Sequence, residues 1–351
     1  MIALLAGCGG QSQPVAKRDA CGARVGKVKG PATQLTFRGD DDVVADVAAL
    51  CERLRTLKVA RELEGVGRNH LVVTVPSTAA RGAMSVARTG RLAFYDWEAN
   101  VIGPGGKPEP TDPKVTGGAR AGFSGSLEYY AAVERASKLP GTVEADNARK
   151  GSAFYAVDPG ARKVYGSGAA TRAAALAVVP KAERAQAKVR EVKPGTVVLS
   201  AEELPGAAPS FFVLKDVAAL RGSDIVNPRQ RLDTGPGATG APIVTFDFTA
   251  GGAKAFATFT RTIARRGARN AGSAPGTSSA DANQHFAIVL DDDIVSIPYI
   301  DFRANPDGID GSTGSLIQGG FTILSARQLA SILRSGELAV PLELVETKRS
   351  G

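Results

Sequence analysis

The apolar residues of this chain fall in short runs that glycine and proline interrupt, and this limits what it can fold into. The 351 residues include 41 Gly and 20 Pro. No apolar run approaches the 18 or so residues of a membrane-spanning helix, so we expect a chain that is at most tethered to a membrane. With 43% hydrophobic and 22% charged residues, it is predicted to form two or three compact units rather than a disordered chain.

Residues 33–98 show strand and helix patterns in a βαβαβ order. The predicted strands cover 33–39, 69–76 and 90–98, and the predicted helices cover 41–59 and 77–89. In the first helix Val43, Val47, Leu50, Leu54 and Leu57 recur at spacings of three and four, which is typical of a buried helix face. Acidic residues just before Val43 suit the N-terminus of that helix.

The remainder of the chain loses this regularity. A Gly- and Pro-rich boundary follows Trp97, and residues 99–194 carry one predicted helix at 126–139 and one predicted strand at 152–158. From residue 195 strands and helices alternate without βαβ order. We therefore predict an α+β fold with mixed or antiparallel sheets, helices packed on one face and two subdomains.

Three consecutive aspartates stand between two β-branched runs, where a metal site and a tight turn look alike. In an extended chain, adjacent side chains point to alternating faces, so Asp291, Asp292 and Asp293 cannot converge on one ion unless the chain turns there. The flanking runs 288–290 and 294–297 favour a hairpin with solvated aspartates at its turn. Replacing Asp292 with Asn is then expected to be nearly neutral.

The formal net charge of +8 favours anionic partners such as lipid headgroups or wall polymers. The most basic helix pattern places Phe256, Phe259 and Ile263 on one side. Its other side carries Arg261, Arg265, Arg266 and Arg269, and Gly267 stands where a C-cap is expected. Because no aromatic residue lies among these arginines, this run is predicted to be a solvated helix face and not a nucleic-acid site.

The chain contains partial matches to known catalytic and metal-binding motifs, and each lacks a required residue. Asp233-Thr234-Gly235 resembles the aspartic protease triplet but has no second copy to share a proton. Loop 305–309 lacks the third acidic position of a calcium loop. The two histidines, His70 and His285, each begin an apolar strand and lie near no nucleophile motif. We predict no catalytic, cofactor-binding or metal-binding residues, and hence no enzyme.

The three cysteines have different settings. Leu5 to Cys8 resemble the lipobox of bacterial lipoproteins, which implies lipidation of Cys8, although the residues before it are too few and uncharged for a signal peptide. Either the true start lies upstream or the resemblance is chance. Cys21 lies in the polar segment that follows, and Cys51 lies in a helical pattern, so a buried thiol is predicted at Cys51 instead of a disulfide.

Four stretches between residues 195 and 346 carry a longer resemblance. "GTVVLSAEELPG", "PIVTFDFTAGGAKAF", "FAIVLDDDIVSIPYI" and "GGFTILSARQLASILRSGELAVPLELVE" resemble, in order, the extracytoplasmic P1 head region of SecD, a subunit of the bacterial protein-export machinery. Matching positions are Leu290, Asp291, Pro298, Gly320, Phe321, Leu333, Arg334, Gly336 and Pro341. The resemblance implies a hairpin after Leu290 and no metal there. Gly336 is expected at positive φ at the end of a helix, and Gly320 at a close approach of strands.

The resemblance extends upstream and sets the expected domain ranges. Residues 33–98 also resemble the P1 base of SecD, where "VVTVP" matches without the following glycine. The expected ranges are a lipobox-like segment and tether at 1–32, a base-like subdomain at 33–98, a connecting region at 99–194, a head-like domain at 195–346 and a tail at 347–351.

This resemblance implies a membrane-tethered extracytoplasmic module that contacts translocating or unfolded polypeptide or Sec translocon components. The chain stops where SecD continues into transmembrane helices, so a module without its own proton-driven motor is expected. An anionic membrane surface is the other expected partner, with no cofactor and no nucleic acid. The expected location is the extracytoplasmic face of the cell membrane, lipid-anchored, or a secreted or periplasmic-side location if the lipobox is not used. The alternative is an envelope scaffold or adaptor lipoprotein that binds a wall component or a partner protein, with the basic helix as its contact.

Overall fold

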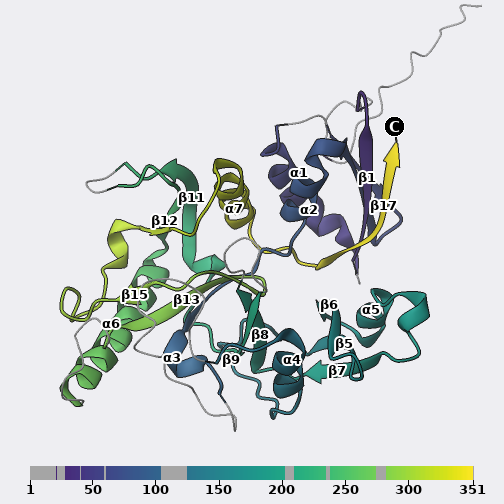
Figure 1. Ribbon diagram of the computed structural model, residues 1–351. Helices are drawn as coiled ribbons and strands as arrows, with labels where there is room; N and C mark the ends of the chain where they lie inside the picture. The colour runs from purple at the N-terminus through teal and green to yellow at the C-terminus, as the bar shows by residue number, and fades with distance from the viewer. Residues whose placement is uncertain are drawn as a thin grey trace, which may run out of the picture. The chain divides into compact units, whose positions relative to one another are not determined.

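The computed structural model describes residues 21, 28–39, 41–58, 61–103, 125–201, 209–234, 238–273 and 282–350. They form two compact units (Figure 1). Unit 1 comprises the residues up to Arg88 and those from Leu338 onward, and unit 2 comprises Thr89–Glu337. Both units combine helices with largely antiparallel sheets, so the predicted α+β class is confirmed.

Unit 1 is a four-stranded antiparallel sheet with helices on one side (Figure 1). The strand order is β17 (Leu342–Ser350), β1 (Ala32–Gly39), β3 (His70–Pro76) and β2 (Glu62–Val66). The helices are α1 (Val47–Arg55) and α2 (Ala80–Val86). Alternate residues of β1 and β3, such as Leu35 and Val73, pack with Leu50 and Leu54 of α1 in one buried core. The predicted face of the first helix is therefore the one that unit 1 buries.

The βαβ order expected for residues 33–98 is modified by β2, which the sequence analysis missed. β2 and β3 form a hairpin in which Val66 pairs with His70, and Gly67 takes φ 66° at the turn. The chain thus reverses before β3, and β1 and β3 are antiparallel neighbours. β4 (Leu92–Asp96) belongs to unit 2, while the C-terminal strand β17 pairs with β1, so the compact units differ from the expected ranges at both places.

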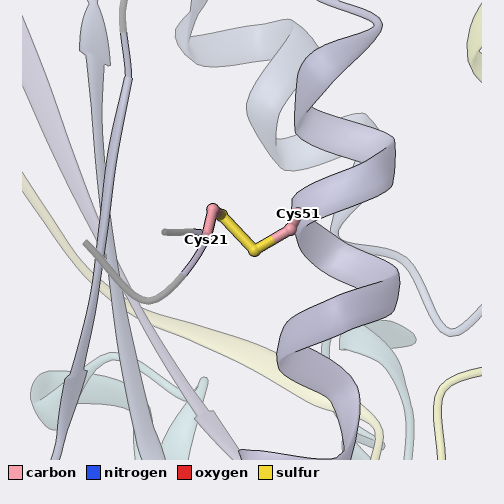
Figure 2. The surroundings of a disulfide bond; sticks show 2 residues. All are labelled: Cys21 and Cys51. Carbon is pink, nitrogen blue, oxygen red and sulfur yellow. A yellow bond between two sulfur atoms is a disulfide. The ribbon is translucent and has the colours of Figure 1, made fainter. Parts of the chain in front are cut away.

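Cys21 and Cys51 form a disulfide, and the predicted buried thiol at Cys51 is wrong (Figure 2). Cys51 lies on α1, and Cys21 lies beside it with a Cα–Cα distance of 5.5 Å. The pair is separated by 30 residues, and both cysteines contact the core of unit 1. The earlier prediction failed because it treated the polar segment around Cys21 as a free tether.

The main sheet of unit 2 is mixed. Its order is β10 (Leu220–Arg221), β4, β13 (Gln284–Leu290), β14 (Asp293–Ser296), β8 (Thr196–Ala201) and β9 (Ser210–Lys215), and β15 (Tyr299–Ile300) also pairs with β13. β14 and β8 are parallel, and the other neighbours are antiparallel.

Both faces of this sheet are buried, which explains the unbroken apolar run of β13. Ile288 and its alternate neighbours face the core formed with α6 (Ala250–Ser273) and α7 (Ile323–Ser335). Ala287 and Val289 face a second core that contains Trp97 of the short helix α3 (Trp97–Asn100). The hairpin sequence thus lies at the centre of unit 2.

α6 confirms the predicted apolar face but not the predicted end of the helix. Phe256, Phe259 and Ile263 are buried, yet the helix continues past Gly267. A Cβ on Gly267 would lie 3.0 Å from the carbonyl oxygen of Ala282 and 3.1 Å from the ring of Phe302, so glycine serves close packing and not a C-cap. Although α6 has 24 residues, no helix in the described part of the chain is long and apolar enough to cross a membrane.

Two smaller sheets complete unit 2. One has the order β11 (Ile225–Leu232), β12 (Pro242–Phe248) and β16 (Ser315–Ile317). The other has the order β6 (Lys163–Ala169), β5 (Ala153–Asp158) and β7 (Lys188–Val192), with α4 (Tyr129–Ser137) and α5 (Arg172–Ala177) packed against it. The predicted helix at 126–139 and strand at 152–158 correspond to α4 and β5, whereas β6, α5 and β7 were missed.

Candidate functional site

The aspartate triplet forms the turn of the predicted hairpin. Leu290 pairs with Asp293 across antiparallel strands β13 and β14, and Asp291 takes φ 58° between them. Aspartate tolerates this left-handed conformation better than most residues, which suits it to the tight turn. The hairpin prediction is confirmed.

The prediction of solvated aspartates is wrong: all three are only partly exposed, and backbone and side-chain donors bind their carboxylates. Asp291 Oδ1 accepts hydrogen bonds from the backbone N–H of Gly90 at 2.9 Å and of Arg91 at 3.0 Å. Asp292 accepts from Arg149 Nη2 at 2.5 and 2.6 Å and from Arg91 Nη2 at 3.2 Å. Asp293 accepts from Ser200 Oγ. In the described ranges, no group of three His, Cys, Asp or Glu side chains is placed to hold a metal ion.

A second carboxylate, Asp216, fixes the segment that carries Arg149. It accepts from the backbone N–H of Ala148 at 3.1 Å and of Arg149 at 2.8 Å, and from the Tyr95 hydroxyl at 2.7 Å. Burial, with Asp216 beside it, holds the pKa of Tyr95 well above its usual value. Burial alone would lower the pKa of Arg149, but Asp292, together with the nearby Tyr155 and Asp216, outweighs it, so that pKa is raised and the guanidinium stays charged. This network is a structural clamp between the hairpin and the 148–149 segment.

The head-like motif positions have structural roles. Leu290 and Leu333 are buried in the core that contains α6 and α7, and Phe321 packs partly against that core. The Pro298 carbonyl accepts from the backbone N–H of Phe286 at 3.0 Å. Pro341 lies just before β17 and belongs to unit 1, whereas the other motif positions belong to unit 2.

Two glycines of the motif take positive φ. Gly336 follows the last residue of α7 and has φ 77° and ψ −178°, so the predicted positive φ is observed. With ψ near 180° this is an extended conformation at positive φ, which favours glycine more strongly than the left-handed helical conformation does. Gly320 has φ 58°, and a Cβ there would meet nothing within 4 Å. The expected close approach of strands at Gly320 is therefore wrong. The chain after it leads into α7, whose N-terminus is capped by the Thr322 side chain.

The two edge strands of the β11–β12–β16 sheet, β11 and β16, differ in whether another strand can pair with them. β11 contains Pro228 and a bulge, and Arg334 Nη2 donates to the Pro228 carbonyl at 2.9 Å. Such features block further strand pairing. β16 pairs with β12, and no other strand that the structure describes lies on its far side. β16 is therefore the edge to which another strand could be added.

Exposed apolar side chains lie on and just after β16. Leu316 is 43% exposed, and Ile323 and Leu324, at the start of α7, are 49% and 48% exposed. We call residues 315–324 the β16 segment; it includes motif positions Gly320 and Phe321. Sequence reasoning missed these apolar residues because a pattern within the chain does not show which apolar side chains stay uncovered. An open strand edge beside apolar side chains can hold an extended polypeptide.

Other candidates from the sequence have different environments. His285 is buried, and its Nδ1 lies 2.7 Å from Glu98 Oε1, so it forms an internal pair. On the basic helix face, Arg266 binds Asp96 and Gln284, and Arg261 Nε donates to the Asp307 carbonyl, so this face is only partly solvated, contrary to the prediction. Cys8, the lipidation candidate, lies outside the described residues.

Comparison with known proteins identifies the head-like region. Residues 197–340 match the family model described as SecDF, P1 head subdomain. The protein translocase subunit SecD of Rickettsia bellii is 30% identical over 165 residues, which is 47% of this chain and 27% of that relative. SecD of Thermobaculum terrenum is 33% identical over 150 residues, which is 43% of this chain and 24% of that relative. The chain thus spans about a quarter of the length of the curated relatives it matches.

Two solved structures are also similar. One is a crystal structure of SecDF in a super-membrane-facing form, with a TM-score of 0.43 and 18% identity, covering 91% of this chain and 30% of that one. The other is a structure of SecDF described as a membrane component that enhances protein export, with a TM-score of 0.40 and 18% identity, covering 89% of this chain and 98% of that one. The predicted resemblance to the SecD family is confirmed, while the base-like range and the lipobox stay predictions.

Proposed function

Because this chain carries the P1 head subdomain of the SecD family at residues 197–340, we propose that it assists protein export by contacting translocating polypeptide or components of the Sec translocon. The family match is the observation that carries this proposal. The clamped hairpin and the motif residues support it indirectly, because they give the head a fixed framework on which a binding edge can be presented.

The β16 segment is the proposed contact. An extended polypeptide adds as a strand beside β16, so its main-chain groups, which all sequences share, supply the hydrogen bonds. Leu316, Ile323 and Leu324 supply apolar contacts of low selectivity. Binding of this kind is weak and broad, which suits a protein that handles many different exported chains.

An extracytoplasmic location fits the Cys21–Cys51 disulfide, since such bonds persist in oxidising compartments and are rare in the cytosol. Lipidation at Cys8 is part of this proposal and rests on the "LLAGC" sequence. Incorporation of radiolabelled lipid into the chain expressed from its own gene in bacterial cells tests it. Label is expected in the natural chain and not in Cys8→Ser, and equal labelling of both would refute lipidation.

Site-specific photo-crosslinking in living cells tests the contact. A photoreactive residue at Leu316 is expected to crosslink to exported chains or Sec components during active export. The matched control is Val143, which is exposed on the same unit but distant from β16 in the sequence. Equal crosslinking from both positions would contradict the proposed edge. Capture of a single wall or envelope protein from Leu316 would favour the scaffold alternative.

A binding titration gives a second measurement. The full chain is titrated with a denatured model protein, and we expect binding in the micromolar range that Leu316→Asp and Ile323→Asp weaken at least tenfold. Val66→Asp, at an exposed position in unit 1, is the control and should bind as the unmodified chain does. No binding at high micromolar concentration would overturn the polypeptide proposal.

A further inference from the structure

The positive charge of this chain is concentrated in a segment outside the head match. Residues 159–193 contain eight Lys and Arg and two Glu, a formal net charge of +6 within a chain of +8. The head match begins later, at residue 197. The segment includes helix α5 and strands β6 and β7 of the β6–β5–β7 sheet, so its charge is carried by ordered structure.

α5 and the residues around it form an outer layer on this sheet. Tyr155 and Val157 of β5 pack in the core that contains α4, whereas Ala156 packs with Ala175 and Val179 in a separate small core. Because neighbouring residues of a strand face opposite sides, α4 and α5 cover opposite faces. We call residues 171–187, on the side away from α4, the basic layer.

The basic layer presents aliphatic and cationic side chains together. Leu176 is 37% exposed and Val178 is 45% exposed. Lys181 and Arg184 follow directly and are exposed, and neither has a carboxylate within 4 Å in the described part of the chain. Arg184 Nε donates to the Val179 carbonyl at 3.2 Å, which keeps its guanidinium near the two aliphatic residues.

The other charged side chains on the face of the sheet that α5 covers form ion pairs or hydrogen bonds within the chain. Lys163 and the Tyr165 hydroxyl both donate to Glu183, at 2.8 and 2.7 Å. Arg172 pairs with Glu191 at 3.3 Å and stacks over the Phe154 ring. The acidic residues of the segment are therefore already engaged, and within the basic layer the unpaired charge belongs to Lys181 and Arg184.

We propose that the basic layer binds the surface of an anionic lipid membrane. Lys and Arg at such a surface are attracted to acidic headgroups, and neighbouring aliphatic side chains add burial at the headgroup boundary. Nucleic acid is a poorer fit, because Tyr165 is buried and Phe154 lies under Arg172, which leaves no aromatic ring here for base stacking. This contact is independent of polypeptide binding at β16 and positions the chain at a membrane.

Vesicle sedimentation with the full, unlipidated chain tests the proposal. Binding is expected to vesicles of phosphatidylglycerol and phosphatidylcholine, but not to phosphatidylcholine alone, and should decline as salt rises. Lys181→Gln/Arg184→Gln should lower the partition coefficient at least tenfold. The control Lys254→Gln/Arg265→Gln removes the same charge from exposed positions of α6 and should bind as the unmodified chain does. Absence of binding to anionic vesicles, or equal loss in both double variants, would overturn the proposal.

Two further arms separate a lipid surface from any acidic polymer. Leu176→Ser should weaken vesicle binding severalfold, while Leu344→Ser, at a position 38% exposed in unit 1, should not. Soluble polyglutamate should not compete at equal charge concentration. If polyglutamate displaces the vesicles and Leu176→Ser has no effect, the layer recognises acidic polymers instead and the lipid assignment fails. Circular dichroism of each variant confirms that it is folded.

Discussion

Arg149 Nη2 donates to both carboxylate oxygens of Asp292, at 2.5 and 2.6 Å, across 143 residues of sequence. Both side chains are largely buried, with 15% and 26% of their surface exposed. Replacing only one partner of such a pair lowers the stability of the fold, because the remaining charge stays in a poorly hydrated environment. The pair makes the hairpin turn a structural anchor of unit 2.

Asp292→Asn is predicted to lower the free energy of unfolding of unit 2 by about 2 kcal/mol, because it leaves Arg149 without its carboxylate. The single Trp of the chain, Trp97, is buried in unit 2, so its fluorescence during urea unfolding reports this unit. The control is Asp307→Asn at an exposed loop position, with an expected change within about 0.5 kcal/mol. Equal, small effects of both substitutions would restore the solvated turn expected from sequence.

The sequence predicted those helices, strands and turns that depend on residues close together in the chain. The two β-branched runs that flank the aspartates predicted the β13–β14 hairpin, and Gly336 after a helical pattern predicted positive φ. β2 was missed because Glu62, Glu64 and Gly65 give it a polar pattern, which an exposed edge strand permits.

Relationships between distant segments could not be predicted in this way. Asp292 was expected to be solvated because nothing near it in sequence suggests Arg149 as its partner. Cys21 likewise lies in a polar segment with no pattern that places it beside α1. The β16 edge depends on which strands pair, which no periodicity of a single segment specifies. Of the β16 segment, the sequence therefore indicated only Gly320 and Phe321, through the family resemblance.

Removing the disulfide is predicted to destabilise unit 1. Closure of a loop of 30 residues lowers the conformational entropy of the unfolded chain, which corresponds to about 3.6 kcal/mol. Cys21→Ser/Cys51→Ser should therefore raise the rate of amide hydrogen exchange in α1, measured by mass spectrometry. A reducing agent should have the same effect on the unmodified chain and none on the double variant. If the unmodified chain alkylates fully at both thiols without reduction, the disulfide is absent in solution.

Gly336→Ala is predicted to cost about 1 to 3 kcal/mol of unfolding free energy, since φ 77° with ψ −178° is strained for any residue with a Cβ. A Cβ at this position would meet nothing within 4 Å, so the cost comes from the backbone and not from a clash. Gly151→Ala is the control, because that glycine also has open space around it and does not take positive φ. Trp97 fluorescence in urea measures both, and equal costs would exclude backbone strain as the reason.

The last prediction concerns the acid sensitivity of α4 and the β6–β5–β7 sheet on which it packs. Burial raises the pKa of Glu134, but the hydrogen bond from Arg190 Nε at 2.9 Å and the nearby Lys138 outweigh it, so the pKa is lowered. A carboxyl with a lowered pKa in the folded state stabilises the protein above its unfolded value of about 4.5, and this contribution is lost as the pH falls through the folded value.

Glu134→Gln should therefore lower the unfolding free energy by up to about 1 kcal/mol at pH 7, the usual range for a partly exposed pair. The difference from the unmodified chain should shrink below pH 4.5 and vanish once Glu134 is protonated. Glu128→Gln, at a more exposed carboxylate 3.7 Å from Arg162, is the control, with an expected change within about 0.5 kcal/mol at pH 7. Urea unfolding across pH 3 to 7 measures the effect, and a difference that stays constant over this range would show that Glu134 acts through packing and not through its charge.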